Sequence, residues 1–469
     1  MKQILFCFSI LLLPGIGLSA GQDAPHIIGS ELSILWVIPF VGILLSIAIF
    51  PLITPHFWHR HFGKISFFWA AVLIIPFIIK HGLSIILYEL IHVTLLEYLP
   101  FIILLLALFT ISGGIRLTGT LVGKPVTNLV IILVGTLFAS WMGTTGAAML
   151  LIRPLIRANA KRQYKVHTIV FFIFLVANIG GSLTPLGDPP LFLGFLKGVS
   201  FFWTTSAMLK PMLFMVISLA IIYFIIDSYL FNQEQPIEDD GEIHKLGLEG
   251  SVNLLLLCGV MASVLLSGFW HPDVHFSVYH VRLELQSLAR DLLLLILTAT
   301  SWKLTPKPIR EANEYTWFPI AEVAKLFAGI FVTIIPAIAI LKAGTSGALS
   351  SVIESVSKDG EPVNYMYFWL TGLLSSFLDN APTYLVFFNT AGGDPVTLMN
   401  AQYNTLLAIS TGAVFMGANT YIGNAPNFMV KSIAESSGIE MPSFIGYLVK
   451  YSLPILFPLY FIVMYIFFL

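Results

Sequence analysis

Long apolar stretches alternate with short polar ones along almost the whole chain. A stretch of about 20 apolar residues can cross a bilayer as a helix, because a helix satisfies its own backbone hydrogen bonds where water is absent. Several stretches here are shorter, and we expect these to be half-helices or re-entrant pieces. The stretches centre on Ile34–Leu52, Ser66–Ile79, Leu83–Leu96, Phe101–Ile115, Leu129–Trp141, Val166–Ala177, Met212–Leu230, Leu254–Leu266, Leu292–Thr300, Ile320–Ile340, Tyr367–Leu378, Leu406–Met416 and Ile445–Leu469. We therefore predict an all-α polytopic membrane protein with about eleven transmembrane helices.

The composition agrees with a chain that lies mostly in lipid. Hydrophobic residues make up 57% of the 469 residues and charged residues 10%, whereas a soluble domain carries about 25% charged residues. The net charge of −1 gives no indication of a nucleic-acid partner. Cys7 and Cys258 form neither a disulfide framework nor a metal-ligand spacing, and we expect no cofactor.

Polar segments divide the chain into four parts. Residues 1–20 have the pattern of a signal peptide, with Lys2 before an apolar stretch and small residues, although an uncleaved first span is the alternative. The acidic segment 233–250 is predicted to link a first transmembrane repeat, 31–232, to a second, 251–469. This pattern is typical of a multi-pass protein of the bacterial inner membrane.

Two polar breaks recur along the chain at a constant spacing. The shared residues of the longer break are Gly181, Thr184, Gly187 and Pro190 in the first half and Gly417, Thr420, Gly423 and Pro426 in the second. One offset relates all four pairs (417 − 181 equals 423 − 187), and it also places the small polar stretch 143–147 onto 379–383. Because two separate breaks share this offset, we interpret them as an internal repeat rather than a coincidence.

Charge placement indicates that the repeats are inverted. The stretch 153–165 contains five basic residues and should be cytoplasmic, because Lys and Arg accumulate in cytoplasmic loops. The equivalent stretch, 389–401, contains none. Opposite charge bias at equivalent positions is typical of an inverted-topology repeat.

The breaks carry the candidate chemistry. Gly and Pro release backbone groups from the helical ladder, and freed carbonyls together with Ser, Thr, Asn and Asp oxygens can bind a small cation. The candidate residues for ion or substrate binding are Thr144, Thr145, Thr184, Asp188, Asp379, Asn380, Thr383, Asn419, Thr420, Asn424 and Asn427.

Two of these candidates are acids, and each has a structural alternative. An ionisable group within a membrane marks a functional site by default, but an Asp can also cap a half-helix. We favour ion binding for Asp379 and expect Na⁺ at Asp379 and Asn380. For Asp188 the two roles are balanced, because the following Pro189-Pro190 pair is typical of a helix start.

Other features narrow the class of protein. Glu89, His92 and Glu97 lie in or beside a membrane segment, where they either relay protons or face the interface. The chain has no nucleotide-binding loop, nucleophile elbow or HExxH motif, which disfavours ATP-driven transport and hydrolysis. A membrane enzyme is the alternative class, and a channel fits paired broken helices less well than a carrier does.

Two motifs resemble those of the ion transporter superfamily. The stretch 178–188, Asn-Ile-Gly-Gly-Ser-Leu-Thr-Pro-Leu-Gly-Asp, is similar to a signature of sodium/proton antiporters of the NhaD kind. The stretch 375–382, Ser-Ser-Phe-Leu-Asp-Asn-Ala-Pro, resembles their second-half Asp-Asn-x-Pro motif. Most of residues 31–469 also resembles a bacterial group described as citrate transporters or sodium:proton antiporters.

The resemblance implies a specific architecture. It implies two inverted repeats, each with a re-entrant hairpin and a broken helix, and a homodimer with a scaffold domain and a moving transport domain. By position, the hairpin tips are Thr144-Thr145 and 379–383, and the helix breaks are 184–190 and 419–427. The first tip departs from the antiporter pattern, because no acid stands there and its Gly-Thr-Thr is closer to the neutral tips of carboxylate symporters.

These observations favour a secondary active transporter, a sodium (cation)/proton antiporter with exchange at a membrane-buried carboxylate. A carboxylate can hold either H⁺ or Na⁺, and this competition couples the two transported ions. The alternative is a sodium- or proton-coupled citrate/dicarboxylate symporter. A citrate carrier would benefit from Arg near its anion, and neither break contains one. The expected partners are the lipid bilayer and small ions, with a carboxylate under the alternative.

Overall fold

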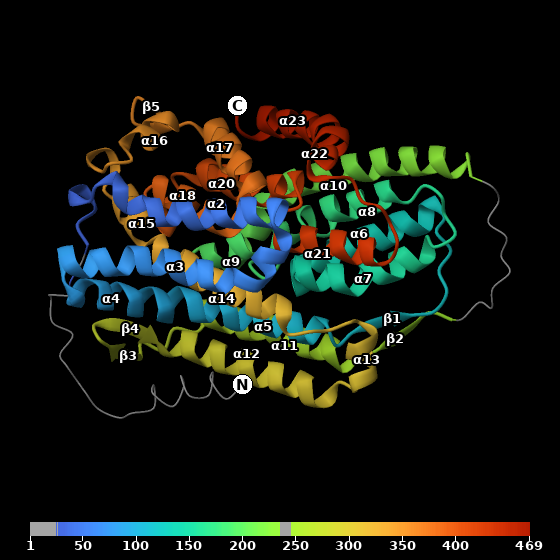
Figure 1. Cartoon of the computed structure of the whole chain (residues 1–469), viewed down its shortest axis with the longest axis horizontal. Coiled ribbons are helices and arrows are strands. Elements are labelled where there is room, and N and C mark those ends of the chain that lie inside the picture. Colours follow the sequence, from blue (N-terminus) through green and yellow to red (C-terminus); the bar gives the residue numbers. More distant parts are fainter. Residues whose placement is uncertain (1–24, 26, 235–244) are drawn as a thin grey trace.

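A computed structural model describes residues 25, 27–234 and 245–469 of the chain (Figure 1). The predicted signal peptide, residues 1–20, lies outside the described residues, as does most of the predicted linker. The described part consists mainly of helices, with three short two-stranded ribbons. The prediction of an all-α polytopic membrane protein is confirmed.

The helices of the first half follow one another with short connections. Two 3₁₀ turns, η1 (Gly29–Glu31) and η2 (Ile34–Val37), precede them. The helices are α2 (Ile38–Ile53), α3 (Pro55–His81), α4 (Leu83–Val93), the π-helical turn η3 (Thr94–Tyr98), α5 (Leu99–Ser112), α6 (Pro125–Met142), α7 (Thr144–Ala158), α8 (Val166–Leu175), the 3₁₀ turn η4 (Ile179–Leu183), α9 (Pro189–Leu196) and α10 (Phe201–Phe231).

The second half contains more numerous and shorter elements. Its helices are α11 (Val252–Phe269), α12 (Leu285–Leu304), α13 (Lys307–Ala312), α14 (Phe318–Thr333), α15 (Ile335–Lys342), η5 (Gly344–Ser346), α16 (Ser350–Ser355), α17 (Asn364–Phe377), α18 (Asn380–Thr390), α19 (Pro395–Met399), α20 (Tyr403–Met416), η6 (Gly417–Asn419), α21 (Ala425–Ser436), α22 (Phe444–Tyr447), the π-helical η7 (Leu448–Leu456) and α23 (Phe457–Phe467). The antiparallel ribbons pair β1 (Arg116–Thr118) with β2 (Gly247–Glu249), β3 (His275–Val278) with β4 (Val281–Glu284), and β5 (Ser357–Lys358) with β6 (Glu361–Pro362).

Fewer helices have the length of a full crossing than the eleven expected. Within the described residues, eight are long and apolar enough to cross a membrane, or nine if α14 and α15, bent by 41°, form one span. Other apolar stretches form shorter helices, such as α17 and α20 with 14 residues each. These lengths are below the roughly 20 residues that a crossing needs, which agrees with the predicted half-helices.

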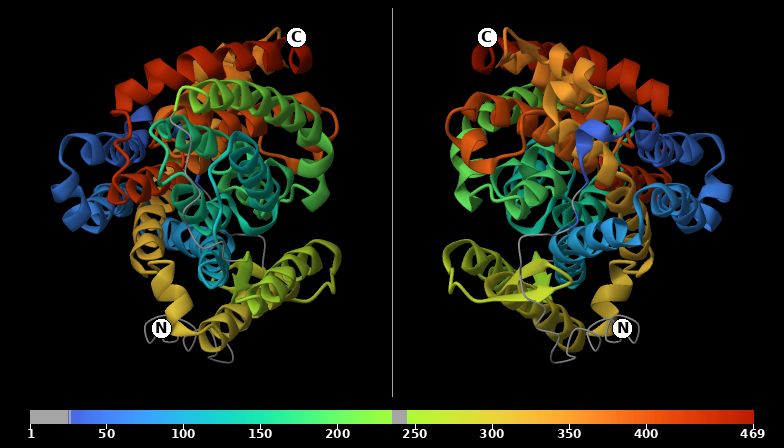
Figure 2. Two further views of the ribbon diagram at one scale, coloured as in Figure 1. Left: turned by 90° about the vertical axis from the view of Figure 1, so that its right-hand side faces the viewer. Right: turned by 90° about the vertical axis from the view of Figure 1, so that its left-hand side faces the viewer.

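The helices form two groups that contain elements of both halves. One group, which we call the flanking body, consists of α2–α5, η3, α11, α12 and α14, with α14 packed on α3 and α12 on α5. The other, the crossing body, consists of α6–α10 and α17–α21, with α18 packed on α9 and α20 on α17. Figure 2 shows α11 and α12 on one side of the molecule, away from α22 and α23 on the other.

The equivalent hairpins of the two halves extend in opposite directions. In Figure 1, α6 and α7 lie to the right of the centre, whereas α17 and α18 lie to its left. This arrangement agrees with inverted repeats. The exact division at residues 31–232 and 251–469 stays a prediction.

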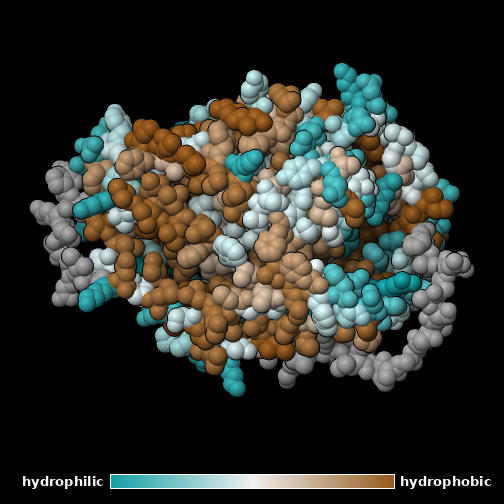
Figure 3. Space-filling model, turned by 180° about the vertical axis from the view of Figure 1, so that it is seen from behind, coloured by the Kyte–Doolittle hydropathy of each residue, from teal (hydrophilic) through white to brown (hydrophobic). Residues whose placement is uncertain are grey.

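Burial places the helix breaks at the centre of the protein. In the segment Val166–Leu183, which leads into the first break, 89% of the residues are buried, whereas in an 18-residue apolar window of Pro55–His81 and of Phe201–Phe231 only 28% are. The weakly buried helices expose Ile, Leu and Phe, as lipid-facing helices do. Figure 3 shows one such face, with a broad apolar area between more hydrophilic ends.

Candidate functional site

The first hairpin tip is held against the first helix break. Gly143 separates α6 from α7 and has a φ of +81°, a conformation that glycine adopts without strain. The Thr144 amide donates a hydrogen bond of 2.8 Å to the Gly187 carbonyl. The predicted tip and the predicted break, although separated along the sequence by α7 and α8, therefore form one unit.

The two breaks repeat the same local geometry. The Thr184 hydroxyl donates to the Ser140 carbonyl, and the Thr420 hydroxyl donates to the Ser376 carbonyl. Donors and acceptors are both related by the predicted offset, since 420 − 184 equals 376 − 140. The equivalence of Thr184 and Thr420 is thus visible in the hydrogen bonds as well as in the sequence.

Close backbone contacts explain why glycines recur in both breaks. A Cβ atom on Gly187 would lie 2.1 Å from the Gly181 carbonyl oxygen. On Gly423 it would lie 2.5 Å from the Gly417 carbonyl oxygen. Real Cβ atoms do not approach backbone this closely, so neither break can accept a larger residue without moving.

Asp188 lies at the centre of a cluster of polar residues from both halves. Its side chain is buried, with the residue 1% exposed. Asn380 Nδ2 donates to Asp188 Oδ2 at 2.6 Å, and Asn424 Nδ2 donates to Oδ1 at 2.9 Å. Thr144 Oγ1 donates to the same Oδ1 at 3.3 Å. These four residues, all predicted from the breaks, form what we call the Asp188 cluster.

Asp188 does not cap the helix that it precedes. An N-cap side chain accepts from the second or third amide of its helix. Here Pro189 and Pro190 occupy the first two positions and have no amide hydrogen, and the Asp188 side chain makes no capping bond. The expectation that the proline pair favours capping by Asp188 is therefore wrong, because the pair removes a donor that capping uses.

Asp379 has the capping role instead. Its Oδ1 accepts from the Ala381 amide at 3.0 Å, at the start of α18. Thr383 Oγ1 donates to the Asp379 backbone carbonyl at 3.0 Å. Asp379 is half-buried and makes no hydrogen bond to the Asp188 cluster, although the adjacent Asn380 belongs to it. Of the predicted Na⁺ pair, only Asn380 makes a hydrogen bond to Asp188.

The remaining predicted residues surround the cluster. Asn427 Nδ2 donates to the Gly417 and Thr420 carbonyls at 2.8 and 2.9 Å, which closes the second break. Asn419 Nδ2 donates to Ser376 Oγ at 2.8 Å. Thr145 lines a cavity beside Asp188.

Asn178 is a site residue that was not among the candidates, although it is the first residue of the motif 178–188. Its Nδ2 donates to Asn427 Oδ1 at 2.7 Å, and its Oδ1 accepts from Asn424 Nδ2 at 3.3 Å. It therefore connects the first half to two asparagines of the second. The repeat gave no signal for it, because its equivalent at the same offset is Val414. Ser140 and Ser376 were also missed, but they are identical at that offset and could have been found by it.

A cavity of about 110 Å³ lies beside the carboxylate. Its wall combines the first tip and break with residues of α5 and α14 of the flanking body, including Leu104, Leu108, Pro319 and Val323. Among the described residues that line it, none is basic. The volume has room for several waters or a partly hydrated ion.

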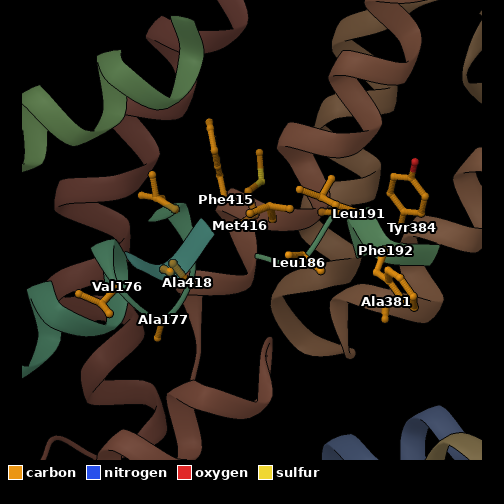
Figure 4. Close-up of a cluster of buried hydrophobic side chains, with 14 of the residues drawn as sticks. Val176, Ala177, Leu186, Leu191, Phe192, Ala381, Tyr384, Phe415, Met416 and Ala418 are labelled. Atoms are coloured by element: carbon orange, nitrogen blue, oxygen red, sulfur yellow. The ribbon is translucent and has the colours of Figure 1, made fainter. Parts of the chain in front are cut away.

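Buried apolar side chains of the core include neighbours of the cluster along the chain, among them Leu186, Leu191 and Ala381. Figure 4 shows Leu186, Leu191 and Phe192 on one side and Val176, Phe415 and Met416 on the other. Buried Asn380 Oδ1 has no hydrogen-bond partner among the described residues. A carboxylate in such surroundings is unfavourable without a proton or a cation, because neutral donors do not balance its charge. The arrangement is suited to holding one of these at a time.

Comparison with known proteins identifies relatives over almost the whole chain. A sequence model of the family described as "Putative citrate transport" matches residues 29–468. Two uncharacterized transporters, from Mycobacterium bovis and Mycobacterium tuberculosis, are each 24% identical over 395 residues, which cover 79% of this chain and 84% of the relative.

Proposed function

Since the chain belongs to the family described as "Putative citrate transport", we propose that it is a secondary active transporter that exchanges Na⁺ for H⁺ at Asp188. The chain is a multi-pass membrane transporter and not an enzyme, as its family and relatives indicate. The exchanged ions and the residue that carries them are the proposal. The proposed exchange requires no cofactor.

One observation carries the proposal: Asp188 is a buried carboxylate with three neutral donors and no basic partner among the described residues. A carboxylate paired with Lys or Arg would be neutralised permanently. Asp188 instead needs a mobile positive charge, and H⁺ and Na⁺ can each supply it. Because both use the same oxygens, binding of one excludes the other, and this competition is the basis of exchange.

The neighbouring side-chain amides can interact with Asp188 both when a cation is bound and when none is bound. In this structure Asn380 and Asn424 point their NH₂ groups at Asp188. Rotation of either amide by half a turn would present its oxygen instead, which is the ligand that a hard cation prefers. The Thr144 hydroxyl can likewise donate to the carboxylate or offer its oxygen. Neutral amides and hydroxyls can make this change, whereas a lysine, which only donates, cannot.

The alternative is a Na⁺- or H⁺-coupled citrate or dicarboxylate symporter, and the family description favours it. Against it, the cavity beside Asp188 is lined by no basic described residue, so an organic anion would face a carboxylate without compensation. In such a symporter, Asp188 would bind only the coupling cation, and the anion would require a basic group at another location.

The membrane placement and assembly are also proposals. We place the chain in a bacterial inner membrane with the basic stretch 153–165 in the cytoplasm, and we expect a homodimer from the family resemblance. The orientation predicts that Arg157→Cys and Asp394→Cys, both at exposed positions, label from opposite sides in a chain without Cys7 and Cys258. Labelling from the same side would remove the inverted arrangement.

Transport by the purified protein in liposomes tests the function. Addition of Na⁺ or Li⁺ outside vesicles with an acidic interior should release protons without any organic anion, and K⁺ serves as the comparison cation. Vesicles with Asp188→Asn protein provide the control for leak. Uptake of radiolabelled citrate or succinate, with no proton release in the cation assay, would establish the symporter instead.

A further inference from the structure

A second buried carboxylate lies on the boundary between the two bodies. Glu97 is in η3 of the flanking body, and its Oε1 accepts from Lys197 Nζ at 2.5 Å. Lys197 follows directly after α9 of the crossing body. The side chains are 6% and 20% exposed, so the ion pair is largely removed from solvent.

The local backbone places Glu97 inside rather than on the lipid face. The span Leu83–Ser112 changes to π-helical geometry at Thr94–Tyr98, which shifts the positions of the side chains around the helix. Such turns occur mostly at functional sites, and an acid within a membrane span has a functional role by default. Glu97 Oε2 is buried without a hydrogen-bond partner among the described residues.

Further charges surround this pair. Glu89 of α4 and Lys342 of α15 both interact electrostatically with Glu97 and Lys197. The four groups carry two positive and two negative charges, which disfavours a binding site for a free cation or anion. Their placement instead favours an electrostatic link between the two bodies. We call the Glu97–Lys197 ion pair the tie.

The tie and the ion site lie at opposite ends of one helix. Asp188 precedes α9 and Lys197 follows it, and α9 has eight residues, which is a length of about 12 Å. The cavity beside Asp188 also contains Leu104 and Leu108 of α5, whereas Glu97 lies before the start of α5. The helices α9 and α5 therefore lie along one boundary, with the cavity toward one end and the ion pair at the other.

The cavity lies toward the basic end of the protein. It includes Phe109, near the end of α5, and Pro319, at the start of α14. The next element after α5 is β1, where the Leu117 carbonyl accepts from Arg157 in the basic stretch. The Glu97–Lys197 pair is thus on the far side of the boundary from the predicted cytoplasm.

We propose that the Glu97–Lys197 ion pair holds the outer side of this boundary closed while the Asp188 cavity faces the basic side, and that the pair separates each time the crossing body moves to expose Asp188 to the other side. The inference rests on the proposed function only in assuming that transport alternates access to Asp188. It does not depend on which ion or anion is carried.

Thiol labelling tests the proposal without reference to transport. In a chain without Cys7 and Cys258, Thr145→Cys reports on access to the cavity. Lys197→Met and Glu97→Gln each remove the tie, and labelling of Thr145→Cys from the side opposite the basic stretch should rise about tenfold, since coupling energies of about 1–3 kcal/mol change equilibria roughly 5–150-fold. The reversed pair, Glu97→Lys with Lys197→Glu, should return the rate toward that of the parent.

A matched control is available within one helix. Lys431 and Glu435 of α21 form an ion pair at 2.7 Å that connects no two bodies, so Lys431→Met should leave the labelling rate unchanged. Unchanged labelling in both Lys197→Met and Glu97→Gln, with folded protein shown by gel filtration, would overturn the proposal. If one variant does not fold, the other still decides it.

Cross-linking tests the same point through transport. A reducible thiol cross-linker between Glu97→Cys and Lys197→Cys should stop transport of whichever substrate the parent carries, and reduction should restore it. Transport at the normal rate by the cross-linked protein would contradict the separation of the pair. A parent without Na⁺/H⁺ exchange would contradict the proposed function alone, since the labelling experiment remains valid.

Discussion

The two breaks share one backbone arrangement but differ in where each half carries its acid. Thr184 and Thr420 make the same hydrogen bond at equivalent positions, yet Asp188 corresponds to Asn424, and Asp379 corresponds to Gly143. The first half places its carboxylate in the break, where it accepts from no backbone amide of α9. The second half places its carboxylate at the hairpin tip, where it caps α18.

This difference places neutral donors from both halves around one carboxylate, Asp188. In the second half the break and the tip contribute Asn424 and Asn380, and both donate to the acid of the first half. The residue equivalent to Asn380 in the first half is Thr144, which makes a weaker contact to the same carboxylate. A symmetric frame thus supports an asymmetric site, in which one half supplies the charge and both supply neutral ligands.

The largest effect on transport is expected from removing the carboxylate charge of Asp188. Asp188→Asn should reduce coupled Na⁺/H⁺ exchange by about a hundredfold or more, because loss of a buried charged partner removes several kcal/mol of cation binding. Proton release from liposomes measures it. The matched variant Asn424→Asp, combined with Asp188→Asn, moves the charge to the equivalent position of the second half and should recover part of the exchange. Normal exchange by folded Asp188→Asn protein would remove Asp188 from the mechanism.

The next effect compares the two neutral ligands at equivalent tip positions. Asn380→Ala should weaken apparent Na⁺ affinity by about ten- to a hundredfold, because a hydrogen bond to a charged group contributes about 1.5–3 kcal/mol. Thr144→Ala should have a smaller effect, since its distance to Asp188 is 3.3 Å against 2.6 Å for Asn380. Na⁺ titration of the exchange rate measures both. A larger loss in Thr144→Ala would reverse the proposed ranking.

The smallest effect on transport is expected from substitution of Asp379. Asp379→Asn should retain most exchange and stability, because Asn caps a helix about as well as Asp, whereas Asp379→Ala should cost about 1 kcal/mol of stability. Thermal unfolding in detergent, together with the liposome assay, separates the two roles. Collapse of exchange in a well-folded Asp379→Asn protein would restore the ion-binding role that the sequence favoured for Asp379.

The sequence predicted the fold and the residues of the candidate site, but it did not predict which of the two acids lies at the centre of the cluster. The constant offset between the halves located both breaks, and Thr144, Asp188, Asn380 and Asn424 were all among the candidates. The choice of Asp379 as the ion-binding acid stays a prediction, but the two acids differ in their capping contacts for a chemical reason. Both precede a helix with an early proline, but Ala381 offers an amide at the second position of its helix, whereas Pro190 offers none.

Two other features differ from what the sequence analysis expected. Asn178 has an apolar equivalent in Val414, so its contact with Asn427 depends on how the halves pack and not on the repeat. Fewer described helices are long and apolar enough to cross than the eleven expected, because the stretches 83–96 and 101–115 join in one span, Leu83–Ser112, and the stretches 367–378 and 406–416 form α17 and α20, with 14 residues each. The helices α17 and α20 end inside the protein, at the second hairpin tip and the second break. There, other parts of the protein and not lipid surround the helix ends.

The separation of Asp188 from its amide partners has a consequence for biosynthesis. Asn424 lies 236 residues further along the chain than Asp188, and Asn380 lies 192 residues further. At about 5–20 residues per second, the ribosome needs roughly 10–50 s to produce the missing partners. During that interval the first half resides in or beside the insertion machinery with an acid that lacks both amide donors, and burial of this acid is least unfavourable in its protonated form. Newly made first halves should therefore depend on the insertion machinery until the second hairpin arrives and completes the site.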